Sequence, residues 1–382
     1  MRVLTAGGEI DLNRPYFWGK GQGGVCPADE PVGIEQGRTS PGAREIVCRL
    51  GMVQDFAQAA EDARRIGNIP LCAEKLRQLV EGEAAAIRRG RNDGTIQAAW
   101  SSADAKVKTD AGIVTRVYAG VDGVMAPMVT AAEKEKRRKN QAIRRQQRSA
   151  AGVGNARELP PARPGADERF KEMKIGLFYD QRKEHRHVFV TEHDHEAFGA
   201  LLKEHAAQVR FEQADQSISL TDGAKWIKSQ ICSVLLLIKT MLLDFYHLSQ
   251  HMHQAAKCCL GETPATAEWV AARLKEMKEV GVTPVLAAID ALEKRMRSPA
   301  KRQSLRKLRD YVVNRMEMLD YRAALAKGWD IGSGPTEAMC KNLTLRLKRP
   351  GMKWDRDHAG AMMNLIGLYE SGQAKAYWAA AA

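Results

Sequence analysis

The order of apolar segments between Gly112 and Asp222 is the feature that most constrains the fold of this chain. Three short segments rich in β-branched and aromatic residues come first, a helical pattern over 194–210 follows, and a fourth β-rich segment runs directly into Asp222. The four β-rich segments are 112–121, 175–179, 187–190 and 217–221. Strands that alternate with helices are typical of an α/β layout, in which helices cover a sheet. We therefore predict an α/β core whose first part spans 104–246.

A long helical stretch interrupts this core. From Tyr246 to about Lys327, leucine, methionine, isoleucine and valine residues recur at three- and four-residue steps, as on the buried face of amphipathic helices. We predict an all-helical insertion over 247–327. The core then resumes over 328–382 with a helix that carries Glu337.

The N-terminal part divides into two regions. Residues 1–40 contain an alternating segment and then a cluster of glycines, which is typical of a strand followed by a loop. Residues 41–100 show two short helical patterns separated by a break at Gly67–Pro70. A DNA-binding helix-turn-helix has this pattern, and so does an ordinary helical hairpin; the sequence leaves both open.

Composition favours a nucleic-acid partner. The chain has 382 residues, 44% of them hydrophobic, and a formal net charge of +13, so it can bury a sizeable core and should attract a polyanion. It has no apolar run of about 18 residues and no charged-then-apolar leader, so we expect no membrane association and a cytoplasmic, nucleoid-associated protein. The seven cysteines are scattered without a CxxC pair. We expect reduced thiols and no structural zinc site.

The most basic stretch lies between the first two predicted strands. We predict a basic loop over 131–165, in which a run rich in lysine and arginine precedes a segment rich in glycine, proline and alanine. Such a run is either a solvated, mobile loop or a loop that lies along DNA phosphates, and both remain open. The candidate DNA-binding residues in it are Arg137, Arg138, Arg144 and Arg145.

Three carboxylates stand where metal ligands could converge. Asp122 and Asp222 each follow an apolar strand segment and precede a glycine, although Asp-Gly is also a common turn. Glu337 lies just after Pro335, which suits the first turn of a helix. Hard divalent cations require oxygen ligands of this kind, and a pair of them can drive phosphodiester chemistry. The predicted Glu337 helix also carries a basic face that could hold DNA, made of Lys341, Arg346, Lys348 and Arg349.

Several runs of the sequence form recognisable motifs. They are 122–125 (DGVM), 222–227 (DGAKWI), 243–247 (LDFYH), and 328–337 (GWDIGSGPTE) followed by 347–354 (LKRPGMKW). Together they resemble the Kra group of bacterial insertion-sequence transposases. The resemblance extends from about Glu9 to Trp378, and the block around Glu337 is its most specific part.

This resemblance implies a ribonuclease-H-like core interrupted by a helical insertion before the last catalytic helix, as in the related Mutator and hAT transposases. It implies that Asp122, Asp222 and Glu337 are the catalytic residues and bind two Mg²⁺ or Mn²⁺ ions. Asp244 and His247 match a signature near the start of the insertion and would support the site.

The chain departs from the Kra group at its N-terminal end. Members of the group usually have paired cysteines on both sides of the position of Tyr16, where this chain has Trp18, Gly19 and Gly21. We therefore predict that 1–40 is a truncated or degenerate form of a zinc-binding-like region.

The histidines allow a second metal-site interpretation. His247 and His251 share a helix face, with His253 and Cys258 nearby, but no second ligand pair of recognisable spacing accompanies them. His247 could instead be an ordinary hydrogen-bonded histidine of the insertion. The four histidines His185, His187, His193 and His195 fall in a polar turn region, where we expect solvent exposure.

The predicted function is that of a DDE-type transposase. It would cleave DNA at the terminal inverted repeats of an insertion sequence and transfer the strand to target DNA. Because two DNA ends react together, we expect a homo-oligomer, at least a dimer. The alternatives are an inactive DNA-binding remnant or regulator, and a DNA nuclease on the same ribonuclease-H fold.

Overall fold

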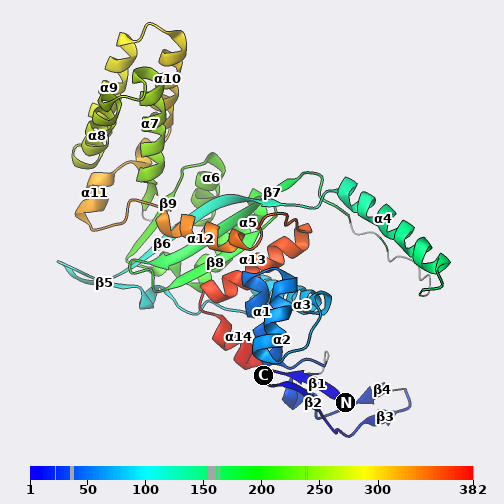
Figure 1. Cartoon of the computed structure of the whole chain (residues 1–382). Coiled ribbons are helices and arrows are strands. Elements are labelled where there is room, and N and C mark those ends of the chain that lie inside the picture. The colour runs from blue at the N-terminus through cyan, green and yellow to red at the C-terminus, as the bar shows by residue number, and fades with distance from the viewer. Residues whose placement is uncertain are drawn as a thin grey trace.

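The computed structural model describes residues 1–21, 23–34, 38–153, 161, 164–236, 238 and 240–381. A mixed sheet forms the centre of the molecule, and helices cover both of its faces (Figure 1). The helical insertion extends from one end of the sheet, and the single helix α4 projects from the other (Figure 1). The protein is thus a mixed α/β structure in which helices predominate, as the alternation of apolar segments predicts.

The central sheet has six strands in the order β10-β9-β6-β7-β8, with β5 paired to the outer part of β6. Strands β6, β7 and β8 are antiparallel neighbours, whereas β9 is parallel to β6 and β10 is parallel to β9. The strands are β5 (Lys106–Thr109), β6 (Gly112–Pro127), β7 (Phe170–Asp180), β8 (Arg186–Thr191), β9 (Gln216–Thr221) and β10 (Thr240–Leu243). Each of the four predicted segments is therefore a strand, and β10 was not foreseen.

The two faces of the sheet have separate cores because side chains alternate along a strand. On β6, Val117, Ala119 and Val121 face helices α5 (His195–Gln208) and α6 (Lys225–Val234). The intervening Tyr118 belongs to the core on the opposite face. The opposite core contains helices α12 (Gly334–Leu345) and α13 (Arg356–Glu370). Position 122 follows the parity of Tyr118, so its side chain belongs to the α12 face.

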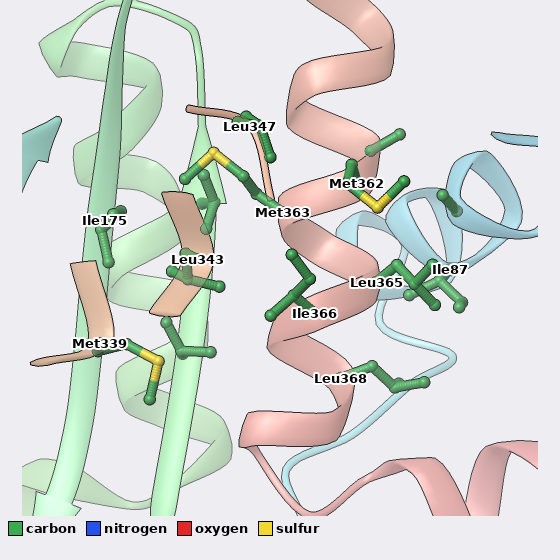
Figure 2. Packing of buried hydrophobic residues seen from close by; sticks show 14 of the residues in the cluster. Ile87, Ile175, Met339, Leu343, Leu347, Met362, Met363, Leu365, Ile366 and Leu368 are labelled. Atoms are coloured by element: carbon green, nitrogen blue, oxygen red, sulfur yellow. The ribbon is translucent and has the colours of Figure 1, made fainter. Parts of the chain in front are cut away.

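Helices α12 and α13 both pack on that face of the sheet, α12 over β6 and β7 and α13 over β8. Met339, Leu343 and Leu347 lie between the sheet, represented by Ile175, and the apolar side of α13 (Figure 2). Helix α13 packs in turn against α3 (Ala73–Asn92), where Leu365 lies beside Ile87 (Figure 2). The final helix is α14 (Ala374–Ala381). This packing places α12, which carries Glu337, over β6.

The insertion has an independent hydrophobic core, built from residues of its own helices and the end of β10. Its helices are α7 (Phe245–Leu260), α8 (Pro264–Glu279), α9 (Val282–Arg295), α10 (Pro299–Val313) and α11 (Tyr321–Ala326). The prediction of an all-helical insertion is in agreement with these elements. No helix among the described residues is both long and apolar enough to cross a membrane.

The N-terminal region differs in detail from the prediction. The described part of residues 1–40 contains two small pairs of antiparallel strands, β1 (Arg2–Thr5) with β2 (Gly8–Asp11) and β3 (Phe17–Gly19) with β4 (Gly23–Val25). Three helices follow instead of two: α1 (Pro41–Val53), α2 (Phe56–Gly67) and α3. The predicted break at Gly67–Pro70 separates α2 from α3, and Asn68 there adopts a left-handed conformation that ends α2.

The predicted basic loop is wrong for its first part, which is the helix α4 (Ala131–Ala150). Thr130 and Glu133 form a capping box that starts this helix, and the following residues are strong helix formers. None of its residues is buried. The remainder of the predicted loop includes 154–160 and 162–163, which lie outside the described residues.

Candidate catalytic site and DNA-facing surface

Asp122 and Asp222 come together through the register of two parallel strands. Tyr118 pairs with Ile218 and Ala119 with Ser219, so continuing the register brings Asp122 level with Asp222. Both positions share the parity of the α12 face. Asp122 lies within β6, which continues to Pro127, and not at the end of a strand as predicted. The strand is longer because Val124 to Pro127 still pair with β7. Asp222 does follow the end of β9.

Helix α12 approaches β6 very closely beside these carboxylates. A Cβ on Gly120 would lie 1.9 Å from Thr336 Oγ1, so only glycine permits this contact. Glu337 is the next residue of α12 after Thr336, in the first turn, and its side chain is exposed. The close contact at Gly120 therefore brings the start of α12, with Glu337, over the strand that carries Asp122.

The electrostatics of Asp122 show that the three carboxylates share one neighbourhood. Burial raises the pKa of Asp122 above its usual value, and the nearby charges of Asp222 and Glu337 raise it further. The Gly123 amide, which donates to Asp122 Oδ1 over 2.7 Å, and the Cys340 thiol, 3.5 Å from Oδ2, act in the opposite direction. Three carboxylates that repel one another at a half-buried site are stabilised by a cation.

Asp244 and Ser333 connect the insertion to the helix of Glu337. The buried Asp244 side chain caps α7 by accepting from the Tyr246 amide over 2.7 Å, and it also accepts a hydrogen bond from the Ser333 hydroxyl. Ser333 Oγ lies 3.5 Å from Glu337 Oε1. The predicted supporting residue Asp244 thus lies where α7 meets the start of α12. Ser333 is the N-cap residue of α12, but its side chain makes no capping hydrogen bond to that helix.

The donor set suits a hard divalent cation in chemistry, because its members are carboxylate oxygens from β6, from the turn after β9 and from the start of α12. Within the described ranges, however, no three His, Cys, Asp or Glu side chains are already close enough to hold a single ion. The Glu337 side chain is exposed at the start of α12, Asp122 lies within β6, and Asp222 lies in the turn after β9.

The basic residues near α12 do not form one continuous helical face. Lys341 is exposed on α12, while Lys348 and Arg349 are exposed on the turn after it. These three residues line a pocket of about 460 Å³ together with Val124 of β6 and Cys340. Since Cys340 contacts Asp122, this positively charged pocket adjoins the carboxylates.

Arg346 is a correction to the predicted DNA-binding set. Its side chain is buried, its Nε donates to the Gly51 carbonyl over 2.9 Å, and its guanidinium lies over the rings of Phe56 and Trp354. Burial lowers the pKa of Arg346 to about 10. A guanidinium enclosed in this way joins α1 and α2 to the region after α12 and is not available to DNA.

The other predicted DNA-binding residues lie on the projecting helix α4. Arg137 and Arg144 are exposed and share one helix face with Asn140 and Gln141, while Arg138 and Arg145 are half-buried. The start of α4 is attached to the core by an ion pair between Lys134 and Asp355, at 2.8 Å, and by another between Glu133 and Lys353. Helix α4 therefore presents the charges of Arg137 and Arg144 to solvent.

A cluster of aromatic and cationic side chains at the insertion was missed at the sequence level. Tyr311 of α10 lies between His251, with ring centroids 4.0 Å apart, and the Arg315 guanidinium, 4.0 Å from the Tyr311 ring. His247 packs against His251 at 5.0 Å. The sequence holds no signal that links Tyr311 or Arg315 to the carboxylates. They lie about 90 residues after Asp222, and the path of helices α7 to α10 returns them to it.

Comparison with known families bears on the part of the chain that contains two of the three carboxylates. Residues 180–379 match the model of a family described as Uncharacterised protein family (UPF0236), and this match spans more than half of the 382 residues. The chain belongs to this family. No curated protein matches the chain.

The region that defines UPF0236 here includes Asp222, Asp244 and Glu337, the whole helical insertion and α13. It begins at Asp180, the last residue of β7, so Asp122 and α4 lie before it. In this UPF0236 chain, the matched region supplies β9, the insertion and α12, and the preceding residues supply the central strand of the sheet.

Proposed function

We propose that this chain is a DDE-type transposase that cleaves the DNA strands at the ends of an insertion sequence and transfers them to target DNA. One observation carries the proposal: the parallel register of β6 and β9 brings Asp122 level with Asp222, on the face over which α12 holds Glu337. These carboxylates come from segments far apart in the sequence, and a simple turn function for the two Asp-Gly pairs does not require them to meet.

The sheet topology supports a ribonuclease-H-like core. Three consecutive antiparallel strands, β6 to β8, occupy one side, and β9 and β10 extend the sheet in parallel on the other side. The helical insertion enters after β10 and returns before α12. This is the arrangement that the resemblance to the Kra group implies, with the last catalytic helix after the insertion.

In this proposal Asp122, Asp222 and Glu337 bind a pair of Mg²⁺ or Mn²⁺ ions. When bound, the ions neutralise charge on the scissile phosphate and activate the attacking oxygen. The protein's own residues orient the reactants: Asp244 and Ser333 hold the start of α12 in place. The attacking groups are water in cleavage and the freed 3′-hydroxyl in strand transfer.

The DNA would lie across the pocket lined by Lys341, Lys348 and Arg349 and along α4. Exposed cations at both places can release counterions from DNA phosphates, which gives affinity without sequence preference. Helices α2 and α3 are the candidates for a helix-turn-helix that reads the terminal inverted repeats. A homo-oligomer, at least a dimer, in the cytoplasm and associated with the nucleoid would bring two DNA ends together.

The test is cleavage and strand transfer in Mg²⁺ or Mn²⁺, on duplexes that carry the DNA flanking the coding region. Asp222→Asn and Glu337→Gln remove a ligand charge with little change of shape. Asp110→Asn and Glu279→Gln are the matched controls, because both carboxylates are exposed and lie far from the site in the fold. We expect the first pair to lose at least about 100-fold in rate and the controls to keep wild-type rates.

Two outcomes would replace the proposal. Tight, salt-sensitive DNA binding without any cleavage by the wild type would favour an inactive DNA-binding remnant or regulator. Cleavage of branched DNA without strand transfer would favour a DNA nuclease on this fold.

A further inference from the structure

The turn at Asp222 is held from outside the sheet, by the end of the helical insertion. Arg315 Nε donates to the Gly223 carbonyl over 3.0 Å, and the Tyr311 hydroxyl lies 3.4 Å from the Asp222 carbonyl. Both contacts are made to backbone oxygens of the turn. The Asp222 side chain takes no part in these two contacts; its Oδ1 accepts a local hydrogen bond from the Ala224 amide over 2.9 Å.

Tyr311 and Arg315 are themselves rigidly placed. The centroid of the Tyr311 ring lies 4.0 Å from that of the His251 ring and 4.0 Å from the Arg315 guanidinium carbon. Arg315 Nη1 also donates to the Tyr311 carbonyl over 3.2 Å. Side chains restricted by packing and hydrogen bonds hold their partners more precisely than mobile ones.

Gly223 shows that the turn and the insertion fit closely. Its φ of +71° is a conformation that favours glycine, and a Cβ there would lie 2.7 Å from Arg315 Nε and 2.7 Å from Leu243 Cδ1. The Asp222-Gly223 pair is therefore more than a turn signal: the glycine makes room for the arginine.

We propose that Arg315 and Tyr311 are positioning residues, which lock the Asp222-Gly223 turn so that the Asp222 carboxylate is presented level with Asp122. The helical insertion thereby forms part of the carboxylate site. This inference rests on the proposed function for its consequence in metal binding, but the lock itself is a property of the chain alone.

The experiment measures hydrogen-deuterium exchange of the backbone over 222–226 in the full chain, without metal or DNA. We expect Arg315→Ala to speed exchange at the Ala224 amide by about tenfold, because the turn loses a hydrogen bond that restrains it. Arg315→Lys should restore part of the protection, and Tyr311→Phe should cause a smaller increase. Arg309→Ala is the matched control, since Arg309 lies on α10, the helix of Tyr311, but pairs with Asp290 at 3.0 Å.

The second readout is the affinity for Mn²⁺ alone. Arg315→Ala should weaken it by about tenfold, the effect typical of losing a residue that orients a metal ligand, while Arg309→Ala leaves it unchanged. Equal exchange and equal Mn²⁺ affinity in the two alanine variants would overturn the inference. Faster exchange in Arg315→Ala in a chain whose wild type binds no Mn²⁺ would support the lock and contradict the proposed function.

Discussion

Helices α13 and α4 occupy opposite extremes of burial in one chain. Ten of the 15 residues of α13 are buried, among them Leu365 and Met363, and the helix packs on α12 and α3. None of the 20 residues of α4 is buried, and the contacts at its start include the ion pairs of Lys134 with Asp355 and of Glu133 with Lys353 and a hydrogen bond from the Lys134 ammonium to the Pro164 carbonyl. Helix α13 thus supports the fold around the carboxylates, whereas α4 is exposed to solvent.

Substitutions in α13 and in α4 should therefore have different effects. Helix α13 is held in place by burial, and it packs against α12, the helix of Glu337. Substitutions of its buried residues should therefore lower the free energy of unfolding. Helix α4 has helix-forming residues and many charges but no apolar stripe to pack against the core. Substitutions there should act on DNA affinity and not on the free energy of unfolding.

The largest expected effect comes from truncating the buried helix. Leu365→Ala should lower the free energy of unfolding by about 2–5 kcal/mol, because the side chain is fully buried and a cavity would remain. Ile143→Ala on α4 should change it by less than about 0.5 kcal/mol, because Ile143 is 51% exposed. Urea unfolding measures both. Similar losses in the two variants would mean that α4 packs against the protein in solution.

Acid should lower the free energy of unfolding through two buried histidines, His187 and His205. His187 Nε2 and His205 Nδ1 are 2.9 Å apart in the core, and burial lowers the pKa of both rings, that of His205 to about 3. The unfolded chain binds protons below about pH 6.5 while the folded rings stay neutral, so stability is full above that pH and falls as the pH decreases toward 3. Each ring contributes up to about 1.4 kcal/mol per pH unit.

The check is urea unfolding at several pH values between 7.5 and 5. His205→Gln should flatten the dependence by about the contribution of one ring, although it also destabilises the core at every pH. His253→Gln replaces an exposed histidine of α7 and should leave the slope unchanged. Equal slopes in all three proteins would show that the His187-His205 pair is not buried as a neutral pair.

The next prediction compares a buried cation, Arg346, with an exposed one, Lys348. Arg346→Met should cost about 1–3 kcal/mol of unfolding free energy, because the Gly51 carbonyl loses its donor and the contacts with Phe56 and Trp354 change. It should leave DNA affinity unchanged. Lys348→Gln should weaken DNA binding and keep wild-type stability. A loss of affinity in Arg346→Met without a loss of stability would restore Arg346 to the DNA-binding set.

The smallest expected effect concerns the charges of α4. Replacing Arg137 and Arg144 by glutamine should reduce the slope of log affinity against log salt by about two, since each lost phosphate contact removes roughly 0.9. Replacing Lys275 and Lys294 of the insertion, both exposed, is the matched control with the same loss of charge. Fluorescence anisotropy with a labelled duplex measures the slopes. An unchanged slope in the Arg137 and Arg144 double variant would place no DNA on α4.

The sequence predicted the elements whose pattern is local. The strand segments, the helical insertion and the start of the Glu337 helix at Pro335 follow from alternation, from three- and four-residue spacing and from proline. Helix α4 was missed because it has no apolar period. Its capping box, Thr130 with Glu133, was the available signal.

The remaining features depend on contacts between distant segments. His187 was expected to be exposed, yet it is buried against His205, since the packing of α5 on the sheet decides its environment. The continuation of β6 past Asp122 depends on pairing with β7, and the contacts of Tyr311 and Arg315 depend on the path of the insertion. Local patterns carry no information on such contacts.

The most direct test of the central claim, that Asp122, Asp222 and Glu337 form one cation site, is Mn²⁺ binding measured by calorimetry on the full chain. We predict that the wild type and Asp110→Asn bind Mn²⁺ with the same affinity. Asp122→Asn, Asp222→Asn and Glu337→Gln should each weaken binding by at least about tenfold. Unchanged Mn²⁺ affinity in all three variants would contradict the claim.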